Sequence, residues 1–205
     1  MSVNNSVVII DTACANLNSV RFALERLGVT PLVTAEAEQI QAADKVILPG
    51  VGTAQAAMRN LQQLQLVEVI RNLQQPVLGI CLGMQLLTAW SAEGNVDCLN
   101  VIPARTERLL GNGLPLPHMG WNTLKNVGDG AFDSFNDGDY AYFVHSYAVA
   151  TDAYTIASSH YGQTFAAMIR HHNFYGAQFH PERSGAVGAR ILKRFLELTD
   201  ADTRA

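Results

Sequence analysis

In the first half of the chain, short apolar runs alternate with amphipathic segments. Runs short enough for buried strands lie at residues 6–11, 30–34, 45–48 and 77–80. Apolar residues recur with a helical period between and after these runs, at residues 17–27, 36–43, 53–75 and 82–90. Asn16 and Thr53 precede two predicted helices as N-cap residues, and Gly28 ends the first helix. This alternation predicts a mostly parallel sheet that is covered by helices on both faces.

The second half has patterns that are typical of strands. Predicted strands lie at residues 99–110, 140–150, 154–160, 165–170 and 174–179, with turn sequences between them. Residues 187–198 form an amphipathic helix that closes the chain. We interpret these strands as antiparallel additions to the sheet or as a small flanking sheet. The sequence thus predicts one three-layer α/β domain over residues 1–205, with ligands at the carboxyl ends of the parallel strands.

Composition narrows the class of protein. The chain has 205 residues and a net charge of −4, and no run of Lys or Arg indicates a nucleic-acid partner. No apolar stretch approaches the ~20 residues of a membrane span, and the N-terminus does not have the pattern of a signal peptide. The three cysteines, Cys14, Cys81 and Cys98, do not have the spacing of a disulfide framework. We therefore expect a cytoplasmic protein.

Cys81 stands at the junction between a predicted strand and a predicted helix. Gly79 and Gly83 flank it at a distance of two residues, which is the pattern of a nucleophile elbow with Cys in place of Ser. Glycine is needed there because the strand and the helix approach each other closely. The helix N-terminus favours a thiolate, and the N–H of Leu82 is placed to stabilise an oxyanion. The alternative is a buried structural cysteine, which the two glycines disfavour.

Among the six histidines, His180 has the most suggestive surroundings. It follows a predicted strand, and Glu182 is close enough in sequence to bind the imidazole and fix its tautomer. A strand-end turn explains this short motif about as well when it is taken alone. Together with the elbow, however, it predicts a Cys-His-Glu triad. A metal site is not expected, because the adjacent His171 and His172 point to opposite faces of a strand.

Two glycine-containing segments are further candidates. Residues 49–52, Pro-Gly-Val-Gly, follow a predicted strand and could supply a second oxyanion N–H, although an ordinary turn explains them too. They do not have the ending of a phosphate-binding P-loop. Residues 118–122, His-Met-Gly-Trp-Asn, read as a loop that exposes Met119 and Trp121 to a partner, with a half-buried aromatic as the alternative.

The motifs at residues 79–85 and 179–182 together resemble those of the class I (triad) glutamine amidotransferases. Further segments at residues 16–20, 48–52, 117–122, 142–147 and 178–185 are similar to the glutaminase subunits of imidazole glycerol phosphate synthase. The resemblance covers nearly the whole chain in order. It implies a flavodoxin-like fold, with a mostly parallel central sheet and antiparallel additions in the C-terminal half.

The resemblance also implies roles for individual residues. Cys81 would be the nucleophile, His180 the acid and base, and Glu182 its orienting partner. Backbone groups for the oxyanion would come from Val51, Gly52 and Leu82. Glutamine would be held by Gly50, Gln85, His145, Ser146 and Tyr147. The partner surface would include Asn16, Ser19, His118, Met119, Trp121, Asn122 and Arg183.

Two departures from the family pattern lie on the expected partner side. Cys14 and Ala15 precede Asn16 where many members have a glycine, and Arg183 stands where Lys is common. Neither departure touches the predicted triad. Coupling to the partner is therefore the part of the resemblance that they put in question.

The implied activity is hydrolysis of the side-chain amide of L-glutamine, without a metal or another cofactor. The ammonia would pass to a separate (β/α)8-barrel cyclase that makes imidazole glycerol phosphate and an aminoimidazole carboxamide ribonucleotide in histidine biosynthesis. Such a barrel needs ~250 residues, so this chain has no room for it. We expect a heterodimer whose glutaminase is nearly silent until the cyclase binds its ligand.

Three other functions are compatible with the same motifs. The chain could serve another synthase, such as those of anthranilate or guanine nucleotides, although the segment at residues 118–122 argues against this. It could be a binding module that has lost its chemistry, although all three triad positions are filled. A cysteine peptidase on a similar scaffold is the third alternative, and it leaves the other synthase-like segments unexplained.

Overall fold

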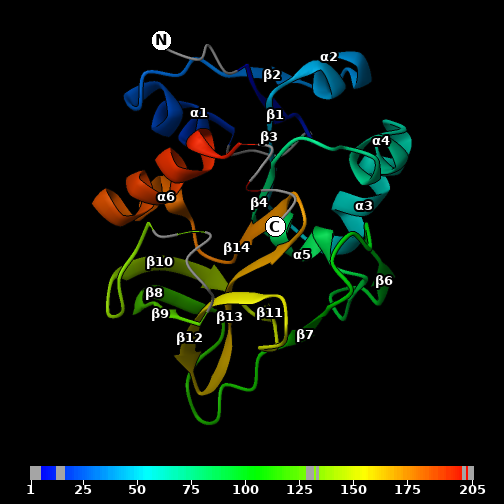
Figure 1. Ribbon diagram of the computed structural model, residues 1–205. Coiled ribbons are helices and arrows are strands. Elements are labelled where there is room, and N and C mark those ends of the chain that lie inside the picture. Colours follow the sequence, from blue (N-terminus) through cyan, green and yellow to red (C-terminus); the bar gives the residue numbers. More distant parts are fainter. Residues whose placement is uncertain (1–5, 13–16, 128–131, 133, 200–201, 203–205) are drawn as a thin grey trace.

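The computed structural model describes residues 6–12, 17–127, 132, 134–199 and 202 (Figure 1). Its helices are α1 (Leu17–Arg26), α2 (Ala37–Ala42), α3 (Ala54–Gln63), α4 (Val67–Arg71), α5 (Leu82–Leu87), the 3₁₀ helix η1 (Pro181–Arg183) and α6 (Gly185–Glu197). Its strands in the first half are β1 (Val7–Ile10), β2 (Leu32–Thr34), β3 (Lys45–Gly50), β4 (Val77–Cys81), β5 (Trp90–Ser91) and β6 (Val96–Asp97). Those in the second half are β7 (Arg105–Arg108), β8 (His118–Thr123), β9 (Lys125–Asn126), β10 (Tyr140–His145), β11 (Tyr147–Val149), β12 (Thr155–Tyr161), β13 (Gln163–His171) and β14 (Phe174–Ala177).

An eight-stranded sheet runs through the centre in the order β2-β1-β3-β4-β14-β13-β12-β9. The pairs from β2 to β14 are parallel, and the pairs from β14 to β9 are antiparallel. Two smaller sheets flank it, with the orders β10-β8 and β11-β7-β5-β6. The predicted fold class is therefore confirmed, and both forms of antiparallel addition are present.

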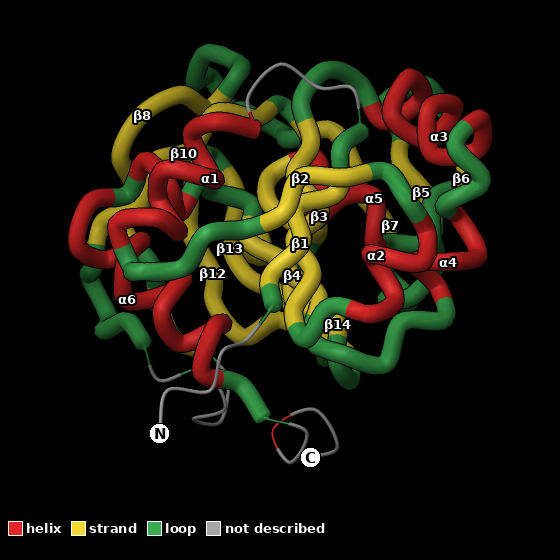
Figure 2. The backbone as a smooth tube through the Cα atoms, turned by 90° about the horizontal axis from the view of Figure 1, so that it is seen from above, coloured by secondary structure: helices red, strands yellow, loops and turns green. Residues whose placement is uncertain are grey.

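The two faces of the sheet bury separate clusters of apolar side chains. Ile9, Ile47 and Leu78 point to the side of α1 and α6, whereas Ile10 and Leu48 point to the side of α2 to α5. Figure 2 shows these two groups of helices on opposite sides of the central strands. Successive residues of a strand point to opposite faces, so a strand that is covered on both faces is apolar throughout. The apolar runs predicted these strands for that reason.

Two helix ends lie where the predicted capping residues place them. Gly28 (φ 82°) ends α1 as predicted, and the N–H of Val29 donates to the carbonyl of Leu24. The hydroxyl of Thr53 accepts from the N–H of Ala56 and caps α3. Asn16, the predicted cap of α1, lies outside the described residues.

The single helix predicted over residues 53–75 is wrong. The chain leaves α3 at Gln65, which has a φ of 56°, and the N–H of Leu66 donates to the carbonyl of Leu61. This is a Schellman motif with Gln in place of Gly. Leu61 and Leu66 are both fully buried, so apolar burial holds a break that the local sequence did not indicate.

The helix predicted to reach Trp90 is also too long. Helix α5 ends at Leu87, and Trp90 belongs to β5. Residues 99–104 of the strand predicted at 99–110 are irregular instead. Their N–H groups bind the last carbonyls of α5, as in Leu99 to Leu86 and Val101 to Leu87. These hydrogen bonds pair the free carbonyls at the C-terminus of α5. The residues that make them are therefore not available for a strand.

Three features of the second half differ from the prediction. Residues 118–122, predicted as a loop, belong to β8, which pairs antiparallel with β10. The strand predicted at 140–150 divides at Ser146 into β10 and β11, which lie in different sheets. Strand β14 is parallel to β4, not an antiparallel addition. Within the described residues, no helix is long and apolar enough to cross a membrane.

Candidate active site

The chain turns sharply from β4 into α5 at Cys81. This residue has φ 54° and ψ −109°, a conformation that costs a non-glycine residue on the order of 1–3 kcal/mol. The surrounding backbone segments are in close contact. A Cβ at Gly83 would lie 1.8 Å from the carbonyl oxygen of Leu48, and one at Gly79 would lie 2.6 Å from that of Gly83. The predicted reason for the two glycines is therefore confirmed.

Gly50 is part of the same close contact. It pairs with Cys81 across β3 and β4, and a Cβ there would lie 2.7 Å from the backbone nitrogen of Gly83. The predicted glycine-rich loop thus begins inside the sheet, at the last residue of β3. Val51 and Gly52 follow it, and the side chain of Val51 is exposed. The end of β3 at Gly50 is therefore packed against the elbow at Cys81, whereas Val51 and Gly52 lie outside the sheet.

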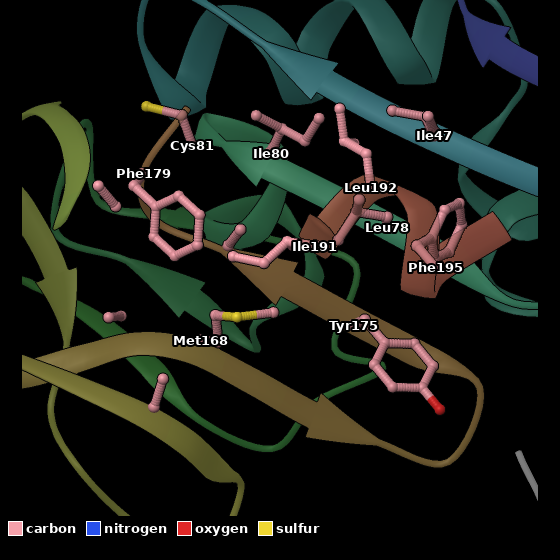
Figure 3. Close-up of a cluster of buried hydrophobic side chains, with 14 of the residues drawn as sticks. Ile47, Leu78, Ile80, Cys81, Met168, Tyr175, Phe179, Ile191, Leu192 and Phe195 are labelled. Atoms are coloured by element: carbon pink, nitrogen blue, oxygen red, sulfur yellow. The ribbon is translucent and has the colours of Figure 1, made fainter. Parts of the chain in front are cut away.

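The thiol of Cys81 lies at the margin of the apolar cluster under α6. In Figure 3 its sulfur points away from Ile80 and the other labelled side chains. The sulfur is 3.7 Å from the carbonyl oxygen of Val144 and 3.8 Å from Nε2 of Gln178. Both contacts come from the second half of the chain, so the strained turn aims the thiol at elements that fold around it.

His180 and Glu182 form a buried ion pair beside the thiol. Nδ1 of His180 lies 2.8 Å from Oε1 of Glu182, and the two side chains are 13% and 2% exposed. The 3₁₀ turn of η1 brings the carboxylate back to the imidazole, as the spacing predicts. The N–H of His180 donates to the carbonyl of Tyr142, which ties this segment to β10.

The pKa of His180 is raised despite burial. Burial by itself lowers the pKa, because it disfavours the charged imidazolium. Hydrogen bonds to Cys81 and Glu182, and the negative charges on these groups, act in the opposite direction and are stronger together. His180 therefore carries a proton beside the carboxylate of Glu182 and the sulfur of Cys81.

A small cavity adjoins this pair. It is lined by Leu17, Val20, Pro49, Gly50, Val51, Ile80, His180 and Glu182. It has about 10 Å³ of space, which is room for roughly one water molecule. The end of β3, the elbow strand and the histidine turn therefore meet at one place, as predicted.

The residues predicted to hold the substrate form a hydrogen-bonded network. Nε2 of Gln85 lies 2.9 Å from both the carbonyl oxygen of Tyr147 and Oε1 of Gln178. The carbonyl of Ser146 accepts from the N–H of Leu109. Gln85 is one helical turn from Cys81, as predicted, but its amide nitrogen already has protein partners.

His145 and His118 form a second pair of buried histidines. Nε2 of His145 lies 2.9 Å from Nδ1 of His118, and Nδ1 of His145 lies 2.8 Å from the carbonyl of Tyr147. Burial lowers the pKa of His145 to about 3 and that of His118 to about 4. Both rings are therefore neutral at neutral pH.

The predicted partner residues divide between surface and core. Met119 and Trp121 are exposed, with 62% and 55% of their areas accessible, and Arg183 is also exposed. Ser19 and Asn122 are half-buried. The prediction for His118 is wrong, because its ring is 3% exposed and stacks on Phe143 and Tyr161. Asn16 lies outside the described residues.

Sequence reasoning missed Gln178 and Val144, whose groups contact the sulfur of Cys81 in addition to His180. A signal for Gln178 was present: it is a polar residue two positions before His180, and such residues share one face of an extended segment. The contact from Val144 comes through its backbone, so no side-chain pattern could have predicted it.

Comparison with known proteins agrees with this geometry. The family model "Glutamine amidotransferase class-I" matches residues 8–198. The imidazole glycerol phosphate synthase subunit HisH of Idiomarina loihiensis is 70% identical over 194 residues, which are 95% of this chain and 98% of that protein. The HisH subunit of Haemophilus influenzae is 56% identical, over 94% of this chain and 97% of that protein.

Two solved structures have the same fold at 18% identity. A putative GMP synthase protein from Thermoplasma acidophilum matches with a TM-score of 0.72, over 94% of this chain and 93% of its own. A further glutamine amidotransferase structure matches with a TM-score of 0.73, over 94% and 98% of the two chains. At this identity the likeness concerns the fold alone.

Proposed function

This chain belongs to the class I glutamine amidotransferases and, within them, to the HisH subunits of imidazole glycerol phosphate synthase, and on that basis we propose which residues carry its reaction. It is the glutaminase subunit of this synthase and works in histidine biosynthesis. The observation that carries the residue assignment is the elbow at Cys81, with the buried His180–Glu182 pair beside its sulfur.

Cys81 is the nucleophile of the proposed reaction. Its thiolate attacks the side-chain amide carbon of L-glutamine, and the electron pair of the C=O bond moves to the oxygen. His180 donates its proton to the amide nitrogen as the C–N bond breaks, so that ammonia leaves and a γ-glutamyl thioester remains. Water then attacks the thioester, gives a proton to His180 and releases glutamate. The cycle ends with the thiolate and the imidazolium restored.

Glu182 keeps His180 in the form that this cycle needs. Its carboxylate accepts from Nδ1, so Nε2 is the ring atom that faces the reaction. The same carboxylate stabilises the imidazolium before it donates its proton and again after it takes one from water. Because the carboxylate is only 2% exposed, water screens this interaction little.

Backbone N–H groups stabilise the oxyanion in this proposal. Leu82 begins α5 directly after the nucleophile, and Val51 follows Gly50, which pairs with Cys81 across β3 and β4. We expect the glutaminase to be nearly silent until the cyclase binds its ligand, so the oxyanion site opens only then in this proposal. We assign this opening to residues 50–52, with Gly52 at a φ of 89° as a conformationally permissive position.

The partner of this chain is the cyclase, which we propose to be a (β/α)8 barrel. The docking surface lies on the two-stranded β10-β8 sheet, where Met119, Trp121 and Tyr140 are exposed. Val144 pairs with Met119 across this sheet, and its carbonyl contacts the sulfur of Cys81. A partner on this surface would therefore be one strand away from the site where ammonia forms, as channelling requires.

The test is glutamine hydrolysis by the purified chain alone, with the cyclase, and with the cyclase plus its nucleotide ligand. We expect turnover only in the third sample. Cys81→Ala should lose turnover by on the order of 10⁶-fold, because no thioester can form. Cys98→Ala is the matched control, since Cys98 is buried and burial raises its pKa to about 12.

Each result bears on one part of the proposal. Equal turnover in all three samples would keep the chemistry and contradict the opening step. Turnover by Cys81→Ala at the wild-type rate would contradict the assignment of the nucleophile. Activation by a different synthase partner, and not by the cyclase, would contradict the partner assignment.

A further inference from the structure

The side chain of Gln178 is fully buried directly behind the thiol of Cys81. It follows the last residue of β14, and its backbone N–H donates to the carbonyl of Ala167 in β13. Nε2 of Gln178 is 3.8 Å from the sulfur, within hydrogen-bond distance for a sulfur acceptor. A buried amide in this position costs free energy unless both of its ends are hydrogen-bonded.

The orientation of this amide follows from the chemistry of its neighbours. The carbonyl of Tyr147 can only accept, so the Gln85 atom at 2.9 Å from it must be the nitrogen. The same nitrogen lies 2.9 Å from Gln178, so the Gln178 atom there must be the oxygen. The N–H₂ end of Gln178 then faces the sulfur. A rotated amide would place two donors or two acceptors together.

His145 and His118 extend the same hydrogen-bond network on the other side of the Tyr147 carbonyl. The carbonyl of Tyr147 also lies 2.8 Å from Nδ1 of His145, which must therefore carry a proton. Nε2 of His145 is then an acceptor, and Nδ1 of His118 donates to it at 2.9 Å. Both histidines have lowered pKa values, so these roles do not change at neutral pH. The carbonyl of Tyr147, which orients Gln85, thus accepts hydrogen bonds from both Gln85 and His145.

The two contacts of the sulfur favour different protonation states. The carbonyl of Val144, 3.7 Å away, accepts a hydrogen bond from the neutral thiol but repels a thiolate. The N–H of Gln178 donates to a thiolate and has the weaker interaction with a thiol. Gln178 therefore favours the reactive thiolate of Cys81, as His180 does.

We propose that Gln178 is a positioning residue for the nucleophile: its amide N–H, oriented through Gln85 and Tyr147, holds the sulfur of Cys81 in place and stabilises the thiolate. This inference rests on the proposed role of Cys81 as nucleophile. Gln178 itself lies behind the sulfur and does not need to touch glutamine. Its loss should therefore lower kcat for glutamine and leave KM nearly unchanged.

The experiment is the pH dependence of Cys81 alkylation by iodoacetamide, followed by mass spectrometry of the peptide that contains Cys81. Gln178→Met keeps the length of the side chain and removes the N–H donor. We expect its alkylation midpoint to rise by about one pH unit, with a roughly tenfold lower rate at pH values below both midpoints, because one charge-assisted hydrogen bond is lost.

Asn173→Leu is the matched control. Asn173 is also a buried amide, and it binds the carbonyls of Leu73 and Gln75 just before β14, at the opposite end of that strand from Gln178. Its loss should lower stability without moving the alkylation midpoint. If Gln178→Met does not fold, Gln178→Asn retains an amide that is one methylene too short to reach the sulfur, and the same shift is expected.

The outcomes separate this inference from the proposed function. An unchanged midpoint in folded Gln178 variants, or an equal shift in Asn173→Leu, would overturn the role of Gln178. If Cys81 were not alkylated in the wild-type complex with the cyclase and its nucleotide ligand, the nucleophile assignment itself would fail. A shift in the Gln178 variants alone supports the inference even in the absence of the cyclase.

Discussion

Two pairs involving histidine lie in the core of this protein, and they carry opposite charge states. His180 lies beside the carboxylate of Glu182 and the sulfur of Cys81, and its pKa is raised. His145 lies beside the ring of His118 and the carbonyl of Tyr147, and its pKa is lowered to about 3. Burial disfavours the imidazolium in both cases. The partner therefore decides which histidine carries a charge.

We relate this difference to the proposed roles of the two pairs. In the proposed mechanism His180 exchanges protons, which needs a partner that stabilises its charged form, and the carboxylate of Glu182 lies beside it. A histidine that orients neighbours must keep one tautomer, and the neutral His145–His118 pair does so because the carbonyl of Tyr147 fixes the first proton. The two pairs support the site in different ways.

The two pairs change the stability of the folded protein with pH in opposite directions. Histidine in the unfolded chain has a pKa near 6.5, above the values of His118 and His145 in the folded protein. Below pH 6.5 the unfolded state binds more protons at these two residues, so they lower stability as the pH falls towards about 3. The pKa of His180 is raised, so its contribution is fully present below pH 6.5 and is lost as the pH rises through its folded value.

The largest effect is expected when His180 is given the surroundings of the other pair. Glu182→Gln removes the charge and keeps the shape. The pKa of His180 should then fall, because only Cys81 remains to oppose the effect of burial, and kcat for glutamine in the activated complex should fall by about 10²–10⁴-fold. NMR titration of the His180 ring and steady-state kinetics measure the two effects.

Glu68→Gln is a control for Glu182→Gln, because this carboxylate is exposed and pairs with Arg71 on α4. It should leave both quantities unchanged. An unchanged pKa of His180 without the carboxylate would contradict the role of Glu182.

A smaller effect is expected when one neutral histidine is removed. The ring of His118 stacks between Phe143 and Tyr161, so His118→Phe fits the same space and cannot titrate. The loss of stability between pH 6.5 and 4.5 should become less steep by about one proton, or ~1.4 kcal/mol per pH unit. Urea unfolding at three pH values in this range measures the slope.

The control for His118→Phe is His160→Phe, at the exposed end of β12. This change should leave the slope as in the wild type. An unchanged slope in His118→Phe as well would show that the acid sensitivity arises elsewhere.

The smallest effect is expected when the neutral pair receives a carboxylate. Nδ2 of Asn122 lies 3.3 Å from Nε2 of His118, at the half-buried outer end of the network. Asn122→Asp should raise the pKa of His118 by roughly one unit, since an opposite charge favours the imidazolium. NMR of the His118 ring tests this, and Asn122→Ala, which adds no charge, should not raise the pKa.

Much of the fold could be predicted because the inner parallel strands β1, β3 and β4 are buried on two faces. The apolar runs around Ile9, Ile47 and Leu78 therefore mark strands directly. The elbow could be predicted for a similar reason: Gly79 and Gly83 are needed by backbone contacts close to Cys81 in the chain. His180 and Glu182 are only two residues apart, so their pairing is local as well.

The features that were missed depend on contacts between distant segments. The end of α3 at Gln65 depends on the burial of Leu61 and Leu66, and the irregular residues after Leu99 depend on the carbonyls of α5. His118 is in the core because Phe143 and Tyr161 receive its ring. None of these outcomes has a signature within a short window of sequence.

The sequence by itself determined the parallel sheet, the strained turn at Cys81 and the carboxylate beside His180, because these depend on periodicity, on glycine and on neighbours along the chain. Only the tertiary structure decided which amide faces the sulfur and which histidines stay neutral. Gln178 is 97 residues from Cys81, and His118 is 27 residues from His145. Burial and hydrogen-bond direction at such distances are set by packing, and no local pattern encodes them.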